Sequence, residues 1–305
     1  MTVHAREHYA DNAGVRIHGL EWTPDLDPGG VPMVFVPGGT ANAWSGEDLG
    51  RDAASGLIGG RPRALLSISR RGTGSSDAPP SGYGPAEFAS DVEALARRAG
   101  YARFVLFGHS MGVPISLEYA LRYPSRLSGL VLGDAPAAYI DFRAAGTFDR
   151  ALTRPFEFAN ADEALQEFSR GFDDSDRARR DFQRVGHRYF APRGASVRRL
   201  LDREALERLI AESVGAATQY WGRLAQIVCP VMLLQGTGGE WSPLSEDDIT
   251  RYQTALPGLQ VERVPGGHQL GLLGDRAPLL AVLGSFVRGI DAAEGVAVGG
   301  TPADR

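Results

Sequence analysis

Residues 104–122 read FVLFGHSMGVPISLEYALR. This segment joins the apolar run Phe104–Phe107 to a stretch with helical spacing, and Gly108-His109-Ser110-Met111-Gly112 lies between them. A serine in a G-x-S-x-G pattern between a strand and a helix stands on a tight turn, where side chains at the two flanking positions would clash. The start of the following helix aims backbone N–H groups at an oxyanion that forms beside the serine. The pattern therefore predicts that Ser110 is a nucleophile and that the Met111 N–H is an oxyanion donor.

Short apolar runs alternate with helical patterns on both sides of this segment. This alternation is typical of a mostly parallel, doubly wound sheet covered by helices, an α/β fold. We expect strands near residues 7–9, 15–22, 32–36, 64–68, 104–107, 127–132, 231–235 and 259–264, with helices near 85–99, 111–122, 245–256 and 275–289. The first two strands should form a hairpin that turns at Asp11–Gly14.

The alternation stops after Pro136. Residues 137–225 are rich in arginine and acidic residues, and we find no strand-like apolar run among them. Their spacing predicts helices over 161–172, 176–190 and 196–215. A helical insertion in a parallel-sheet protein usually covers the substrate site, so we expect a lid here. The chain then divides into an α/β core (1–136 and 226–290), a helical lid (137–225) and a flexible tail (291–305).

Four segments resemble motifs of the α/β-hydrolase superfamily. They are Val34–Thr40 for the strand-and-oxyanion loop, Ser69–Asp77 for the R-G-x-G-x-S-D loop, Tyr123–Asp134 for the segment before the insertion, and Pro265–His268 for the histidine loop. The resemblance covers nearly the whole chain. It implies that Gly39 supplies the second N–H that donates to the oxyanion. Thr40 is the less favoured candidate for this role. Pro37 stands where the family usually has histidine.

His268 follows a predicted strand and a Pro-Gly-Gly turn, where a base reaches a serine across the top of the sheet. Its role would be to accept the Ser110 proton and return it to the leaving group. The acid that orients it has two candidates. In the family the usual acid slot falls on Gly239, which has no carboxylate, and Glu240 lies one residue later. Asp134, at the end of the strand before the insertion, is the favoured candidate, and Glu240 is the alternative.

Trp44, Trp221 and Trp241 flank the loops expected around this site. We expect them to contact substrate in a mostly apolar pocket, and packing in the core or lid is the competing interpretation.

Composition excludes several classes of function. The net charge of −5 gives no electrostatic footprint for nucleic acid or an anionic membrane. All 32 basic residues are arginine, which excludes a Schiff-base lysine and a Walker A lysine. The single cysteine, Cys229, forms no intrachain disulfide, and the N-terminal residues contain no apolar signal region. No His/Cys cluster has metal-ligand spacing. We expect a cytoplasmic protein that binds no cofactor and no metal.

The leading hypothesis is a cofactor-free serine hydrolase that cleaves an ester, thioester or lactone of a small, largely apolar substrate through an acyl-enzyme on Ser110. Two alternatives stay open. One is a carbon–carbon bond hydrolase, or a biosynthetic cyclase or lyase, because fold does not fix the reaction. The other is a ligand-binding protein that keeps the fold without turnover.

Overall fold

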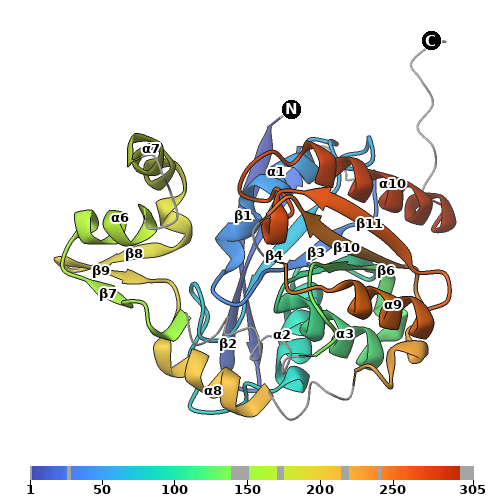
Figure 1. The fold of residues 1–305 in the computed structure, drawn as a ribbon, viewed down its shortest axis with the longest axis horizontal. Coiled ribbons are helices and arrows are strands. Elements are labelled where there is room, and N and C mark those ends of the chain that lie inside the picture. The colour runs from blue at the N-terminus through green and yellow to red at the C-terminus, as the bar shows by residue number, and fades with distance from the viewer. Residues whose placement is uncertain are drawn as a thin grey trace.

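The computed structural model describes residues 2–25, 29–138, 151–169, 175–213, 220–239 and 242–295. A central eight-stranded sheet has the strand order β1-β2-β4-β3-β5-β6-β10-β11 (Figure 1). Its strands are β1 Val3–Asn12, β2 Val15–Pro24, β3 Met33–Val36, β4 Leu65–Ser69, β5 Phe104–His109, β6 Leu127–Gly133, β10 Val231–Thr237 and β11 Gln260–Pro265. The pairs β1–β2 and β2–β4 are antiparallel, and the pairs from β4 to β11 are parallel. The predicted mostly parallel sheet and its opening hairpin are confirmed.

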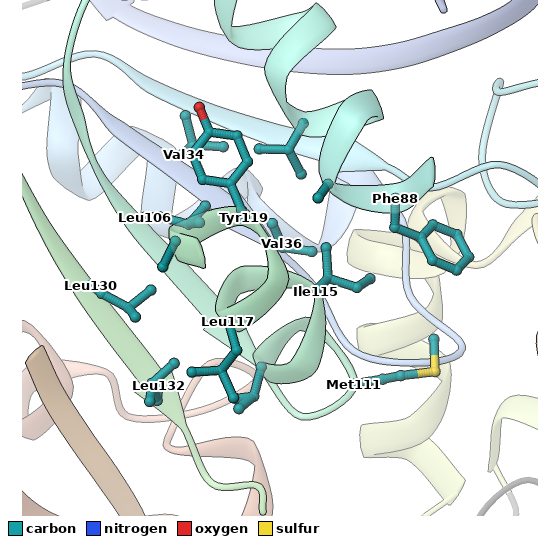
Figure 2. Close-up of a cluster of buried hydrophobic side chains, with 14 of the residues drawn as sticks. Val34, Val36, Phe88, Leu106, Met111, Ile115, Leu117, Tyr119, Leu130 and Leu132 are labelled. Atoms are coloured by element: carbon teal, nitrogen blue, oxygen red, sulfur yellow. The ribbon is translucent and has the colours of Figure 1, made fainter. Parts of the chain in front are cut away.

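Helices cover both faces of this sheet. The helices of the core are α1 Glu47–Ala54, α2 Pro85–Arg98, α3 Gly112–Arg122, α9 Glu246–Ala255 and α10 Ala277–Ala293. Side chains alternate between the faces along each strand. Val34 and Val36 pack with the helices α2 and α3 (Figure 2), whereas Met33 and Phe35 pack with α1 and α10. The buried strands therefore read as continuous apolar runs, because both of their faces are covered.

Helix α1 was not predicted. Its sequence contains Gly50, which weakens the helical pattern. The structure gives the reason for this glycine, because a Cβ there would overlap the buried indole ring of Trp22. The glycine is required for packing against a distant strand, and it makes the helix difficult to predict from the local sequence pattern.

The insertion differs from the prediction of helices alone. It contains α6 Ala161–Ser169, α7 Ser175–Val185 and α8 Arg203–Ser213, together with a small antiparallel sheet in the order β7-β9-β8. The strands of that sheet are β7 Glu157–Phe158, β8 Phe190–Arg193 and β9 Ser196–Arg199.

Two predicted helices are therefore wrong in part. The helix predicted over 176–190 ends at Val185 and is followed by a 3₁₀ turn, Gly186–Arg188, and by the first residue of β8. The range 196–215 begins with β9, because Gly194, with φ of +62°, turns β8 back onto β9. Helix α8 begins only after Asp202, whose carboxylate caps the Ala205 N–H at 2.8 Å. Leu201 lies within the range predicted as a helix, but it forms an isolated β-bridge to Thr73 instead.

The core extends beyond the predicted boundary at residue 290. Helix α10 continues to Ala293, and Asp291 is buried against Arg63 at 2.9 Å. The predicted tail therefore begins inside a helix that is bound to the core. None of the described helices has the length and apolar character to cross a membrane.

Candidate active site

Ser110 lies on a sharp turn between β5 and α3. Its φ is +55°, and its N–H donates to the Gly133 oxygen at 2.8 Å. A Cβ at Gly108 would overlap Ser116 Oγ and the Gly112 oxygen, and a Cβ at Gly112 would overlap the Val36 oxygen. Both glycines of the G-x-S-x-G pattern are thus required by close packing, as the sequence predicted.

His268 is in the 3₁₀ turn η6, Gly267–Gln269, directly after β11. Its Nε2 lies 3.0 Å from Ser110 Oγ. The backbone of this turn is held by His109, whose Nε2 donates to the His268 oxygen at 2.7 Å. Burial, and then the proximity of His268, lowers the pKa of His109 to about 3. His109 is therefore neutral at physiological pH and adds no positive charge beside His268.

The acid beside His268 is Asp134, at the end of β6. Its Oδ2 lies 2.8 Å from His268 Nδ1, and its side chain is completely buried. Its Oδ1 accepts hydrogen bonds from the Gly236 N–H at 2.7 Å and from Ser242 Oγ at 2.8 Å. These three contacts use both oxygens of the carboxylate and fix its orientation. Glu240, the alternative acid, lies outside the described residues.

The loop after β3 passes directly over Ser110. A Cβ on Gly38 would stand 3.2 Å from Ser110 Cβ, so only glycine leaves room there without a shift. Gly39 and Thr40, the predicted oxyanion donor and its alternative, line the same cavity as Ser110. The Met111 side chain is buried among core residues (Figure 2), which leaves its backbone as the part that faces the turn.

Arg70 holds the loop after β3 in place, a role that we did not predict from the sequence. Its Nη2 donates to the Gly38 oxygen at 3.0 Å and to the Gly39 oxygen at 2.7 Å. In a trans peptide the N–H points opposite to the C=O. The N–H groups of Gly39 and Thr40 therefore point away from Arg70. An arginine directly after β4 was the available signal, but only the fold shows which carbonyls it reaches.

A cavity of about 280 Å³ opens beside Ser110 and His268. Its wall is largely apolar, with Phe35, Ala41, Ala151, Leu272 and Leu273, and it also includes Tyr189. Ala151 and Tyr189 belong to the insertion, so this part of the chain contributes directly to the cavity.

Two of the three predicted tryptophans, Trp44 and Trp221, lie away from this cavity. Trp44 meets the His187 ring edge-on at 5.3 Å, and Trp221 packs between Tyr252 at 4.9 Å and the Arg251 guanidinium at 3.7 Å. Neither is among the described residues that line the Ser110 cavity. Trp241 lies outside the described residues. For Trp44 and Trp221 the structure thus shows the packing that was the competing interpretation.

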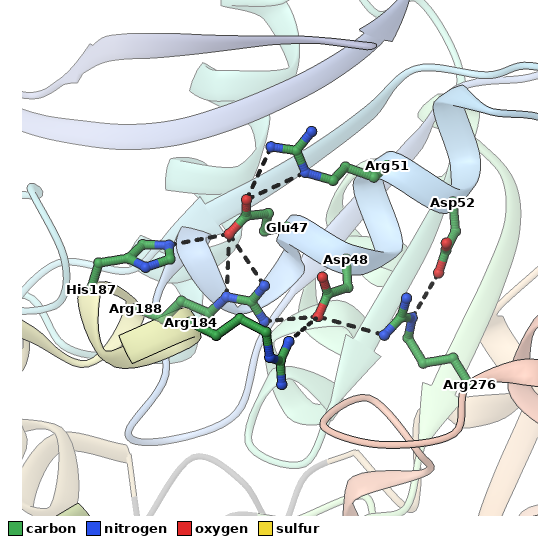
Figure 3. Close-up of polar contacts among 8 residues, drawn as sticks. All are labelled: Glu47, Asp48, Arg51, Asp52, Arg184, His187, Arg188 and Arg276. Atoms are coloured by element: carbon green, nitrogen blue, oxygen red, sulfur yellow. Dashed lines mark hydrogen bonds and ion pairs between the residues drawn. The ribbon is translucent and has the colours of Figure 1, made fainter. Parts of the chain in front are cut away.

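A cluster of charges joins the insertion to the core (Figure 3). Arg188 Nη1 donates to Asp48 at 3.0 Å, and Arg188 and His187 reach Glu47 at 3.2 Å. Burial alone would raise the pKa of Glu47 and Asp48, but the surrounding cationic side chains, with Arg188 foremost, together more than offset it and hold both pKa values below their usual range. Both acids also lie in the first turn of α1, where the helix dipole favours negative charge.

The described residues contain no group of three or more His, Cys, Asp or Glu side chains that could hold a metal ion. The described site brings a serine, a histidine and a buried carboxylate into one hydrogen-bonded chain. These groups stand just beyond the ends of the parallel strands β5, β6 and β11, at the edge where open α/β sheets place their sites.

This fold and this site define an α/β hydrolase. The model of the alpha/beta hydrolase family matches residues 33–282, and the chain belongs to that family. Proline iminopeptidase of Neisseria gonorrhoeae is 31% identical over 122 residues, which are 38% of this chain and 36% of that protein. Putative carbamate hydrolase RutD of Klebsiella pneumoniae is 41% identical over 69 residues, 22% of this chain and 26% of that protein. The chain thus matches little more than a third of the length of the first relative and about a quarter of the length of the second.

The crystal structure of E-2-(acetamidomethylene)succinate hydrolase has the same fold, with a TM-score of 0.77. It is 20% identical, and the alignment covers 93% of this chain and 100% of that one. At this sequence identity, the likeness shows a shared fold and nothing further.

Proposed function

We propose that the protein is a serine hydrolase that cleaves an ester, thioester or lactone through an acyl-enzyme on Ser110. The observation that carries the proposal is the hydrogen-bonded chain Asp134–His268–Ser110, with distances of 2.8 Å and 3.0 Å. A nucleophile that contacts a base, which in turn contacts an orienting acid, is the arrangement that activates a serine.

In the proposed reaction, Ser110 Oγ attacks the substrate carbonyl while His268 Nε2 takes its proton. Asp134 keeps the proton of His268 on Nδ1 and stabilises the imidazolium that forms. The N–H groups of Gly39 and Met111 donate to the oxyanion. His268 then protonates the leaving group, and a water molecule deprotonated by His268 releases the acid and restores Ser110.

The size and the wall of the cavity favour a small substrate that is largely apolar near the bond to be cleaved. Its volume of about 280 Å³ and its wall of Phe35, Leu272 and Leu273 suit a short acyl chain. We further propose that residues 137–225 act as a lid, because Ala151 and Tyr189 of this insertion line the cavity. The carboxylate beside His268 favours turnover over the alternative of a binding protein without activity.

Labelling by a fluorophosphonate, together with turnover of p-nitrophenyl acetate, tests the proposal. We expect Ser110→Ala to abolish labelling and to lower kcat by a factor on the order of 10⁴ to 10⁶. Ser55→Ala is the control, since this serine is exposed at the end of α1 and should leave labelling and turnover unchanged. A wild-type protein that is neither labelled nor active would refute the proposal, and so would a Ser110→Ala variant with kcat within about tenfold of wild type.

A further inference from the structure

A second cavity of about 260 Å³ lies beside the Ser110 cavity. The two cavities share three wall residues, Thr40, Tyr189 and Leu273. The second cavity is lined by arginines from four places in the insertion: Arg154 before β7, Arg184 on α7, Arg188 in the turn η3 (Gly186–Arg188) and Arg199 on β9. We call it the arginine chamber.

The described lining of the arginine chamber has more positive than negative charge. Its four arginines face two carboxylates, Asp48 and Glu167. The neighbouring acids Glu47 and Asp52 add two negative charges, and Arg51 and Arg276, which pair with them at 3.1 Å and 2.7 Å, add two positive ones, so an excess of two positive charges remains although Glu47 also binds Arg188 (Figure 3). An excess of charge inside a cavity with low-dielectric walls attracts an ion of the opposite sign.

The four arginines divide into two kinds. Arg188 and Arg199 are mostly buried, with 3% and 14% of their side chains exposed, and they donate to Asp48 at 3.0 Å and to Glu167 at 2.6 Å. Arg154 and Arg184 are about half exposed, at 51% and 55%, and their ion pairs to the same two acids are 3.8 Å and 3.9 Å long. The first pair holds the walls together, whereas about half of each side chain of the second pair is exposed.

The remaining walls are apolar. Phe168, Val185, Phe190 and Leu201 line the arginine chamber beside the arginines. Apolar walls suit a methylene chain, and the planar guanidinium fork matches the two oxygens of a carboxylate.

We infer that the arginine chamber binds a carboxylate at the end of the substrate remote from the bond cleaved at Ser110. The inference rests on the proposed function and narrows its substrate class to acyl compounds that carry a terminal carboxylate. The scissile carbonyl lies at Ser110, the acyl chain passes Tyr189 and Leu273, and the carboxylate meets Arg154 and Arg184. These two arginines determine specificity and take no part in bond cleavage.

Two p-nitrophenyl esters of adipic acid test this inference. One keeps the second carboxyl group free, and the other carries it as a methyl ester. Since a hydrogen bond to a charged group is worth more than one between neutral groups, we expect wild-type kcat/KM to be about tenfold or more higher for the free acid. The double variant Arg154→Gln/Arg184→Gln should lose this preference mainly through a higher KM for the free acid, so that its kcat/KM values for the two esters become similar.

Arg193→Gln is the matched control. Arg193 is also in the insertion, 66% exposed and ion-paired to Glu157, but it is not among the described residues that line either cavity. This variant should keep the preference for the free acid. Equal kcat/KM for the two esters in the wild type would overturn the inference, and so would a preference that survives in the double variant.

A binding measurement separates this inference from the proposed function. Adipate is titrated into Ser110→Ala by calorimetry, with dimethyl adipate as the neutral control. We expect the Kd of adipate to rise by about tenfold or more when Arg154→Gln/Arg184→Gln is added. If adipate does not bind, the arginine chamber is not a carboxylate site, even if Ser110 is labelled and active. If adipate binds as expected but no ester is hydrolysed, the proposed function fails and the carboxylate site stands.

Discussion

Replacing Asp134 by asparagine tests the hydrogen-bonded chain at the point where it is most constrained. Asp134 Oδ1 accepts from the Gly236 N–H, a donor that cannot turn, and from Ser242 Oγ, which can. An asparagine amide that points its NH₂ at Gly236 would oppose two donors, with a cost of about 1–3 kcal/mol for the unsatisfied buried N–H. The NH₂ of the introduced asparagine should therefore face His268 Nδ1.

That orientation disables the base. His268 Nδ1 must then accept the hydrogen bond, so its proton moves to Nε2, and Nε2 can no longer take the proton of Ser110. To restore the active tautomer, the protein must accept the cost of two opposed donors. This cost lowers the rate by about 10- to 100-fold. Loss of the carboxylate charge beside the imidazolium supplies the rest of a decrease of about 10⁴ in kcat, or about 5 kcal/mol.

The assay is steady-state hydrolysis of p-nitrophenyl acetate near neutral pH, with thermal unfolding measured in parallel. Asp291→Asn is the matched control, because this aspartate is equally buried and binds Arg63 at a place remote from the site. The control should lose stability and keep kcat, whereas Asp134→Asn should lose kcat and remain folded. A kcat of Asp134→Asn within about tenfold of wild type would show that Asp134 does not orient His268.

Three further predictions concern the turn at Ser110, the insertion and the stability of the protein in acid. Gly112→Ala should lower the free energy of unfolding by about 1–3 kcal/mol, because its Cβ overlaps β3; Gly222→Ala, with open space around it, should be close to neutral in chemical denaturation. Asp48→Asn removes the carboxylate that binds three arginines, so trypsin should cleave residues 151–213 faster with little change in Tm; an unchanged cleavage rate would contradict this role. Burial lowers the pKa of His109 to about 3 and that of His18 to about 4. Because these folded-state pKa values lie below the unfolded value of about 6.5, the unfolded chain binds more protons, and stability present above pH 6.5 is lost as pH falls toward 4. Each histidine should cost about 2 kcal/mol at pH 5, and His18→Asn should reduce the slope; equal stability at pH 7.5 and pH 5 would refute the argument.

The α/β core could be predicted because its strands and helices carry their own patterns. The inner parallel strands are apolar runs buried on both faces, and the G-x-S-x-G turn is marked by a local sequence motif. The insertion could be predicted less well. Its small sheet depends on the turn at Gly194 and on a separate cluster that includes Phe158 and Phe190, and neither produces a regular period along the chain.

The candidate site was predictable to the extent that its residues lie at strand ends. Ser110 and His268 stand in local motifs, whereas the choice between Asp134 and Glu240 depends on loop geometry. Arg70 and the arginine chamber were not predictable, since their partners are distant in sequence and meet only after folding. The tryptophans show the opposite error, because aromatic residues near a site in sequence can still pack away from it.

Backbone strain links the three residues of the hydrogen-bonded chain. Among the described residues, the non-glycine residues with positive φ are Ala13 in the opening hairpin, Ser110 at +55°, Asp134 at +50° and Leu270 at +52°. The last three accompany the proposed nucleophile, acid and base, since Leu270 follows His268 by two residues. This left-handed conformation costs about 1–3 kcal/mol for a non-glycine residue and persists only where the surroundings enforce it. At Ser110 and Asp134 the chain leaves a parallel strand and must turn at once so that the side chain projects over the end of the sheet, whereas Leu270 ends the 3₁₀ turn that contains His268. The fold thus places strain where the side chains must converge, and the buried sheet beneath them keeps the three turns in register.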